Sequence, residues 1–148
     1  MDFAVNAEAV FTGTRAALKV MMPQKSGSIV NISSTTAIRA APYMSSYSAS
    51  KAALIQFSAV AAMEAAPANV RVNVVVPGQV MTPATEEWAA KTPETAAKTA
   101  GAIPMLRGGQ PDELAQAIVF LLSDAASYIT GVALPVDGGK AAQLYLPS

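Results

Sequence analysis

Apolar residues in the first part of the chain recur at helical spacing and then run together. From Phe3 to Met22 they fall at mixed three-, four- and seven-residue intervals, which predicts a helix that Pro23 and the turn behind it stop. Ser28 to Ser33 is almost continuously apolar, as expected of a parallel strand covered on both faces. The chain is therefore expected to open with a helix followed by a buried strand.

The same alternation continues along the rest of the chain. In order there follow a small-residue loop, a long alanine-rich helix ended by Pro67, a second buried strand, a further helix and a last strand, at 35–46, 47–66, 70–76, 111–122 and 132–136. Between the second strand and the further helix, a polar, alanine-rich stretch at about 82–104 predicts one or two short helices that form a lid. This order predicts the second half of a doubly wound α/β fold, with three parallel strands and covering helices. Residues 1–148 would form one partial Rossmann-like domain.

Polar residues near the predicted strands could carry chemistry. Ser34 ends the first strand, at the edge where open α/β sheets place their ligands. Tyr47 and Lys51 are four positions apart, so one helical turn brings them to the same face. A phenol has a pKa of about 10, and a neighbouring ammonium lowers that pKa, which suits the group for proton transfer near neutral pH. The spacing alone is more typical of an exposed pair on a solvated face, and the strand, turn and proline ahead of the pair are what favour a site.

Composition narrows the chemistry that such a site could perform. The 148 residues are 52% hydrophobic with a formal net charge of zero, which fits one domain with a core and gives no electrostatic support for nucleic-acid binding. There is no cysteine and no histidine, so acid–base work would fall to Tyr, Lys, Asp or Glu, and we expect no metal site. Without a long apolar run or a basic leader, we also expect no membrane span and a cytoplasmic location.

Four blocks of sequence occur in a fixed order: NISS, YSASK, RVNVVVPGQVMTP and LPVDGG, which start at Asn31, Tyr47, Arg71 and Leu134. In this order, and with Ser34 thirteen residues before Tyr47, the chain resembles the short-chain dehydrogenase/reductase family essentially from end to end. Members of that family transfer hydride between NAD(P) and an alcohol or carbonyl. The resemblance implies an oxidoreductase with NAD or NADP as cofactor and a small alcohol or carbonyl compound as substrate.

The resemblance also assigns roles to single residues, with Asn6, Ser34, Tyr47 and Lys51 as the catalytic set. Tyr47 would give or take the hydroxyl proton, and Lys51 would lower the pKa of Tyr47 and bind the nicotinamide ribose. Ser34 would hydrogen-bond the substrate oxygen, with Ser33 as its structural neighbour. Asn6 would hold a water that links Lys51 to solvent, although an asparagine near a chain start is often only a cap.

The turn after the second strand completes the implied cofactor contacts. Pro77, Gly78, Val80 and Thr82 match the family turn that meets the nicotinamide end through backbone groups and the Thr82 hydroxyl. A plain strand-ending turn would use the same residues. Asn73, inside the strand, is expected to fix neighbouring backbone rather than to touch a ligand.

The sequence lacks the segment that carries the cofactor phosphates in family members. There is no G-x-G-x-x-G motif, and the residue that selects NAD or NADP would lie in the missing part. We therefore expect a fragment that is inactive alone and whose first strand has a bare apolar edge, open to aggregation or self-pairing. One alternative is a short protein that rebuilds its sheet with another chain. The other is a non-catalytic interaction module that pairs through its two long helices, by which family members form homo-oligomers.

Overall fold

The computed structural model describes residues 3–144 and contains one parallel sheet of three strands. The strands lie side by side in the order β1-β2-β3, with bounds Gly27–Ile32, Val70–Pro77 and Ala133–Val136. In the register, Ile29 lies opposite Val72 and Val75 lies opposite Leu134. The predicted α/β fold with three parallel strands is confirmed.

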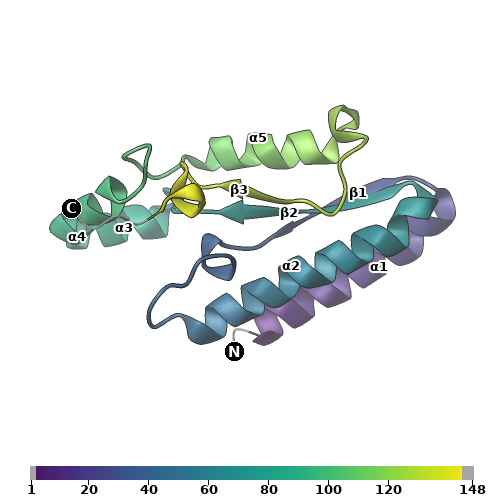
Figure 1. The fold of residues 1–148 in the computed structure, drawn as a ribbon, viewed down its shortest axis with the longest axis horizontal. Helices are drawn as coiled ribbons and strands as arrows, with labels where there is room; N and C mark the ends of the chain where they lie inside the picture. The colour runs from purple at the N-terminus through teal and green to yellow at the C-terminus, as the bar shows by residue number, and fades with distance from the viewer. Residues whose placement is uncertain (1–2, 145–148) are drawn as a thin grey trace.

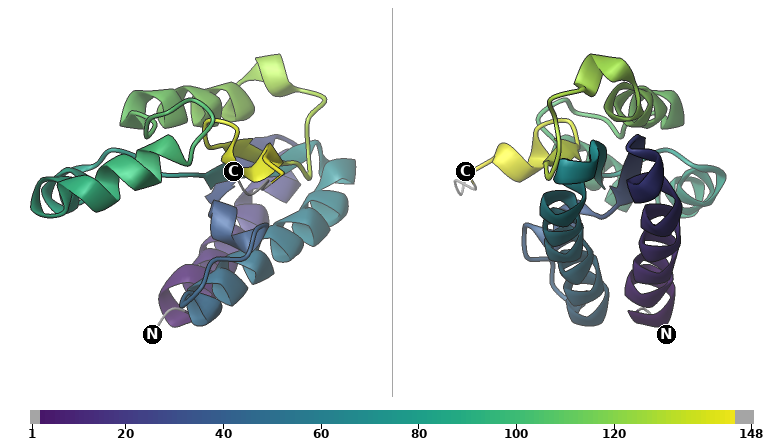
Figure 2. Two further views of the ribbon diagram at one scale, coloured as in Figure 1. Left: turned by 60° about the vertical axis from the view of Figure 1, so that its left-hand side comes forward. Right: turned by 90° about the vertical axis from the view of Figure 1, so that its right-hand side faces the viewer.

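Helices cover both faces of the sheet. Figure 1 shows α1 and α2 on one face and α5 on the other, and Figure 2 shows α1 and α2 lying side by side. The helix bounds are Ala9–Gln24 for α1, Ser45–Ala65 for α2, Pro83–Lys91 for α3, Pro93–Gly101 for α4 and Pro111–Leu122 for α5. A π-helical turn, η1 (Phe3–Glu8), runs directly into α1, and short 3-10 turns η2 (Thr35–Ala37), η3 (Ala66–Ala68), η4 (Asp124–Ala126) and η5 (Lys140–Ala142) mark the loops.

β2 is the centre of the core because it has a strand on each side and helices on both faces. Its side chains alternate with the period of two that a strand imposes. Val72 packs with α2 alanines, and Val74 and Val76 pack with Leu54 of α2, whereas Val75 packs with Leu121 of α5. The small alanine side chains of α2 let that helix lie close to the sheet.

β1 departs from the expectation of a strand covered on both faces. Of its six residues only Asn31 is buried, and Ile32 is 37% exposed. The reason is its position, since β2 is its only strand neighbour in the described part of the chain. The expectation of an uncovered edge on this strand therefore agrees with the structure.

Two helix boundaries also differ from the sequence prediction. α1 does not stop at Pro23 but includes it and ends at Gln24, where Lys25 takes a left-handed conformation (φ 57°) and its N–H closes on the carbonyls of Met21 and Met22. α2 begins at Ser45, two residues before Tyr47. The polar stretch after β2 forms two short helices, α3 and α4, as predicted. No helix within residues 3–144 combines the length and the apolar character that a membrane crossing needs.

Candidate active site

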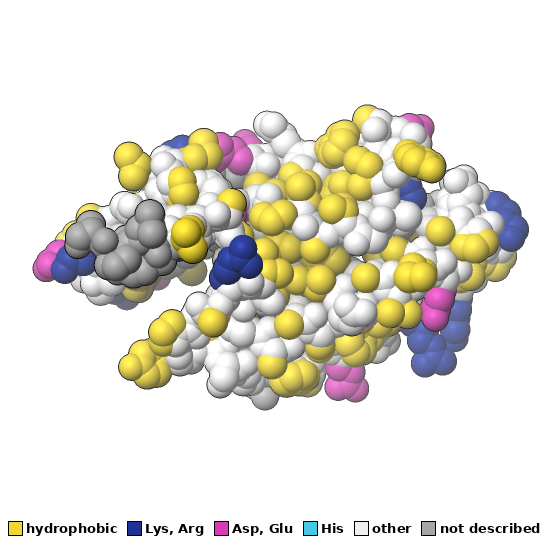
Figure 3. Space-filling view, in the orientation of Figure 1, with side chains coloured by type: hydrophobic (Ala, Val, Ile, Leu, Met, Phe, Trp, Pro, Cys, Tyr) yellow, Lys and Arg dark blue, Asp and Glu magenta, His cyan; other side chains and the backbone are white. Residues whose placement is uncertain are grey.

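The carboxyl ends of the strands face a hollow beside the arm formed by α3 and α4. The arrow of β2 points toward this arm in Figure 1, and Figure 3 shows a notch between the arm and the helices on the other side. A cavity of about 410 Å³ lies at this edge. Its lining includes one residue that follows each strand, Thr35, Gln79 and Lys140, together with Thr95 and Lys98 of α4. Open α/β sheets bind ligands at this edge.

The two serines that follow β1, Ser33 and Ser34, make different hydrogen bonds. Ser33 is buried, and its hydroxyl donates to the carbonyl of Lys51 at 2.9 Å, so it fastens the end of β1 to α2. Ser34 is half-buried, and its Oγ accepts from both the N–H and the hydroxyl of Thr36, at 3.3 and 3.1 Å. A hydroxyl has two acceptor positions and one donor. The contacts of Ser34 leave its own proton available to a ligand, whereas the proton of Ser33 is used inside the fold.

Tyr47 and Lys51 lie in the first turns of α2, on one face as their spacing predicts. The ammonium of Lys51 is 5.9 Å from the centroid of the Tyr47 ring, within the range of a cation–π contact. The same ammonium donates to the carbonyl of Ile32 at 3.1 Å. Burial lowers the pKa of Lys51 because partial removal from water disfavours the charged form. Two hydrogen bonds, from Ser33 and from Lys51, thus join the end of β1 to the start of α2.

Asn6 is not a helix cap, so that alternative for its role is wrong. It lies inside η1, which continues without a break into α1, and the residue that precedes α1 is Glu8. Asn6 is half-buried, and η1 packs against α2, the helix that carries Tyr47 and Lys51. π-helical turns in proteins are frequent at functional sites.

The turn after β2 is held by backbone hydrogen bonds. Gly78 N–H donates to the carbonyl of Val136 at 3.1 Å, and Val80 forms an isolated parallel bridge with Gly109. Thr82 caps α3, with its hydroxyl 3.4 Å from the N–H of Thr85. The Thr82 hydroxyl that the sequence assigned to the nicotinamide end is therefore already engaged in a helix cap.

Sequence reasoning did not single out Gln79, although the structure draws attention to it. The side-chain oxygen of Gln79 is buried and has no hydrogen-bond partner within residues 3–144, while the residue lines the cavity at the strand ends. Buried polar atoms are almost always satisfied, so an orphaned one on a residue that lines a cavity is a candidate partner for a water or a ligand group. Its position directly after Pro77-Gly78 was the available signal.

Comparison with known proteins places this geometry in a family. A family model described as enoyl-(acyl carrier protein) reductase matches residues 2–141, nearly the whole chain. The chain belongs to the short-chain dehydrogenase/reductase family. Members of this family use NAD(P), and the resemblance seen in the sequence is confirmed.

Two curated proteins and one solved structure illustrate the similarity of this chain to its relatives. The chain is 46% identical over 136 residues to a 3-oxoacyl-[acyl-carrier-protein] reductase, FabG, of Thermotoga maritima, covering 91% of this chain and 54% of that protein. It is 41% identical over 140 residues to a cyclopentanol dehydrogenase of a Comamonas species, covering 95% and 56%. The solved structure of ElxO with NADP bound superposes with a TM-score of 0.87 at 31% identity, covering 90% and 54%. The chain spans about half the length of the curated relatives it matches.

Proposed function

We propose that this chain is the catalytic part of an NAD(P)-dependent oxidoreductase that acts on a small alcohol or carbonyl compound. The observation that carries the proposal is the pair of hydrogen bonds between β1 and α2. Ser33 binds the backbone of Lys51 and the Lys51 ammonium binds the backbone of Ile32, which fastens the end of the strand that bears Ser34 to the helical turn that bears Tyr47. The oxidoreductase names of the relatives support the same reaction class.

Each side chain then has a task that its surroundings allow. Ser34 donates its unused proton to the substrate oxygen, an interaction that strengthens as negative charge develops there. Tyr47 gives a proton to, or takes one from, the same oxygen. The Lys51 ammonium, 5.9 Å from the centroid of the Tyr47 ring, places a positive charge beside the proton-transfer residue. Asn6, on the turn that packs against α2, holds a water that links Lys51 to solvent.

The residues after β2 fit the nicotinamide end of the cofactor. The buried Gln79 oxygen, which has no hydrogen-bond partner among residues 3–144, and the cavity at the strand ends offer a polar group and space at the required edge. Backbone groups of Pro77, Gly78 and Val80, with Thr82 close by, would hold the ring, and Lys51 and Tyr47 would hold the ribose. A bound nicotinamide would supply or take up the hydride.

The test is a fusion of this chain to the N-terminal half of the Thermotoga maritima relative, of which the match covers 54%. We expect the fusion to reduce a small 3-oxoacyl thioester with NADPH, and the 148-residue chain alone to bind NADPH weakly or not at all by calorimetry. Tyr47→Phe should lower kcat about 100-fold or more, the range of general acid–base catalysis. Tyr43→Phe is the matched control, since Tyr43 is fully exposed. A Tyr47→Phe fusion with undiminished kcat would refute the assignment.

A second candidate function, a non-catalytic module that pairs with another copy of itself, is favoured by a groove between α1 and α2. The groove has a volume of about 600 Å³, and its apolar lining includes Phe11 and Phe57, whose ring centroids are 4.2 Å apart. Arg15 and Lys19 line it from α1 and Glu64 lines it from α2. A two-fold pairing would let the acid of one copy face the bases of the other.

Sedimentation velocity tests this second candidate. We expect a dimer that Glu64→Lys converts to monomer and that the double variant Lys19→Glu/Glu64→Lys restores. Lys91→Glu, on the exposed face of α3, is the control and should leave the dimer intact. A monomer at all concentrations would exclude pairing through this groove and would leave the catalytic proposal untouched.

A further inference from the structure

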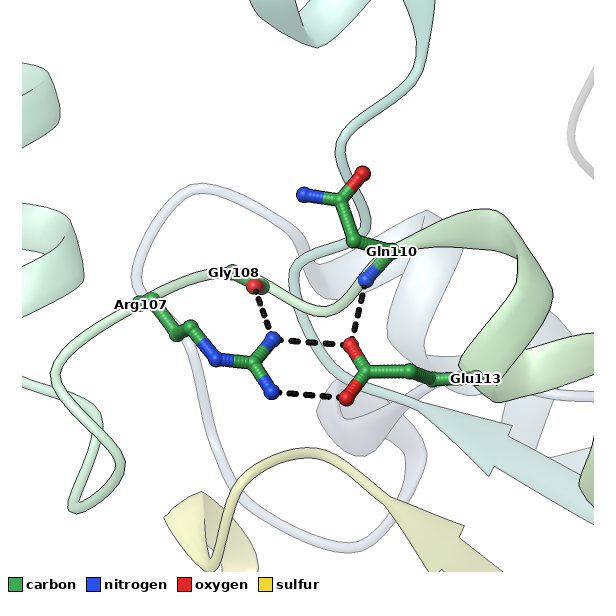
Figure 4. Close-up of polar contacts among 4 residues, drawn as sticks. All are labelled: Arg107, Gly108, Gln110 and Glu113. Atoms are coloured by element: carbon green, nitrogen blue, oxygen red, sulfur yellow. Dashed lines mark hydrogen bonds and ion pairs between the residues drawn. The ribbon is translucent and has the colours of Figure 1, made fainter.

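Outside the proton-transfer residues, the best-formed polar cluster joins Arg107 to Glu113. The guanidinium donates two parallel hydrogen bonds to the carboxylate, at 2.7 and 2.6 Å, and a third to the carbonyl of Gly108 at 3.0 Å. The carboxylate also accepts from the N–H of Gln110 at 2.7 Å (Figure 4). Bidentate pairs of this kind fix orientation as well as distance. The cluster therefore closes the segment 107–110 into a hook at the start of α5.

The hook holds the turn that follows β2. Gly109 N–H donates to the carbonyl of Gln79 at 2.9 Å, and Met81 N–H donates to the carbonyl of Gly109 at 2.8 Å. A Cβ at Gly108 would lie 2.9 Å from the sulfur of Met81, so this flexible side chain packs directly over the glycine. The backbone on both sides of Val80 is thus tied to a segment whose own shape is set by an ion pair.

α5 supplies the fixed support for this arrangement. The helix packs on the sheet through Leu114, Ile118 and Leu121, and Glu113 stands in its first turn. From the other direction, Thr85 of α3 donates to the carbonyl of Val80 at 2.8 Å. The turn is therefore hydrogen-bonded to α3 on one side and to the segment 107–110 on the other. The Arg107–Glu113 pair connects that segment to α5.

We propose that the Arg107–Glu113 pair is a positioning device that sets the backbone of Val80, Met81 and Thr82 for the ligand at the strand ends. The functional half of this inference rests on the proposed function, in which Val80 and Thr82 meet the cofactor. The structural half does not depend on that function, because it states only that the ion pair protects the backbone amides of this turn from local opening. Arg107 and Glu113 are positioning residues and touch neither substrate nor cofactor.

Amide hydrogen exchange by NMR on the 148-residue chain tests the inference. We expect Arg107→Met to speed exchange at Met81 and Gly109 about tenfold, with a clearly smaller change at Val74, whose N–H donates to Val132 in the centre of the sheet. Arg107→Lys keeps the charge and should restore most of the protection. The control is Lys98→Met, which removes the exposed pair between Lys98 and Glu94 on α4 and should leave all three amides unchanged.

A spectroscopic readout separates positioning from general stabilisation. In the native chain, the amide shifts of Gln110 and Met81 should follow one acid titration with a midpoint at about 2, the pKa to which Arg107 lowers Glu113, and Glu113→Gln should abolish it. Equal acceleration of Met81, Gly109 and Val74 in Arg107→Met would make the pair a global stabiliser and overturn the inference. Unchanged exchange at Met81 would overturn it as well. An inactive fusion would count against the proposed function alone, since these amides report without any activity.

Discussion

Replacing Asn73 by alanine should destabilise the chain severely, because this one side chain holds the connection that leads into β3. Asn73 is fully buried in β2. Its amide nitrogen donates to the carbonyl of Ile129 at 2.9 Å, and its oxygen accepts from the N–H of Val132 at 3.1 Å. Alanine would leave the Val132 N–H unpaired, at about 1–3 kcal/mol when this group stays dry. The Ile129 carbonyl would keep only its long hydrogen bond from the Arg71 guanidinium, at 3.5 Å. We expect a loss of about 2–5 kcal/mol of unfolding free energy in total.

Urea unfolding followed by circular dichroism at 222 nm measures this loss. The midpoint should fall while the slope with urea stays the same, since the surface exposed on unfolding hardly changes. Gln116→Ala is the control, because Gln116 is an exposed amide on α5, and its removal should shift stability by about 0.5 kcal/mol or less.

Asn73→Asp makes the reasoning more specific. The aspartate can still accept from Val132 N–H, but it places a buried carboxylate against the Ile129 carbonyl, so its pKa would rise. The loss of stability should be larger at pH 7 than at pH 4.5, where the carboxyl can hold a proton. An Asn73→Ala variant within about 0.5 kcal/mol of the native chain would refute the argument, as would an Asn73→Asp loss that does not depend on pH.

Two further predictions concern Gly78, in the turn after β2, and Glu113, whose ion pair with Arg107 fixes the segment hydrogen-bonded to that turn. Gly78→Ala should cost about 1–3 kcal/mol in urea unfolding, because the new Cβ would lie 2.8 Å from Cβ and 2.9 Å from Cα of Asp137, whereas Gly13→Ala, with nothing within 4 Å, should be neutral or stabilising. Because Arg107 and Gln110 lower the pKa of Glu113 from 4.5 to about 2, the stability contributed by the ionised carboxylate is full above about pH 4.5 and is lost as pH falls toward 2. The native chain should therefore melt above Glu113→Gln at pH 7, with the gap closing as the pH falls, and a constant gap would contradict the assignment.

The sequence predicts the order of helices and strands here because each element has a clear period. β2 reads as a continuous apolar run, and the structure buries it from both sides. β1 reads the same way but is half-exposed, since hydrophobic composition cannot reveal how many strands lie beside it. Pro23 is a weaker stop than expected because a proline in the last turn leaves the remaining hydrogen bonds of α1 in place.

For the candidate site, the sequence predicts which residues share a helix face better than it predicts their hydrogen-bond partners. The four-residue spacing of Tyr47 and Lys51 places both on one face of α2, as expected. Ser33 uses its proton inside the fold and Ser34 does not, but the catalytic role of Ser34 stays a prediction. The cap formed by Thr82 and the buried, unpartnered oxygen of Gln79 could not be foreseen, because each depends on where segments distant from β2 come to rest.

The peptide unit between Ile32 and Ser33 connects the open edge of β1 to the candidate active site. Ser33 N–H donates to the Val75 carbonyl at 2.9 Å, toward β2. Because a trans peptide points its C=O opposite to its N–H, the Ile32 carbonyl of the same unit faces the edge of β1 that has no neighbouring strand within residues 3–144. There the carbonyl accepts a hydrogen bond from the Lys51 ammonium at 3.1 Å. The amine to which the proposal gives a catalytic task is therefore the hydrogen-bond donor to the last carbonyl on the free edge of β1. What lies at that edge thus affects where the amine can point.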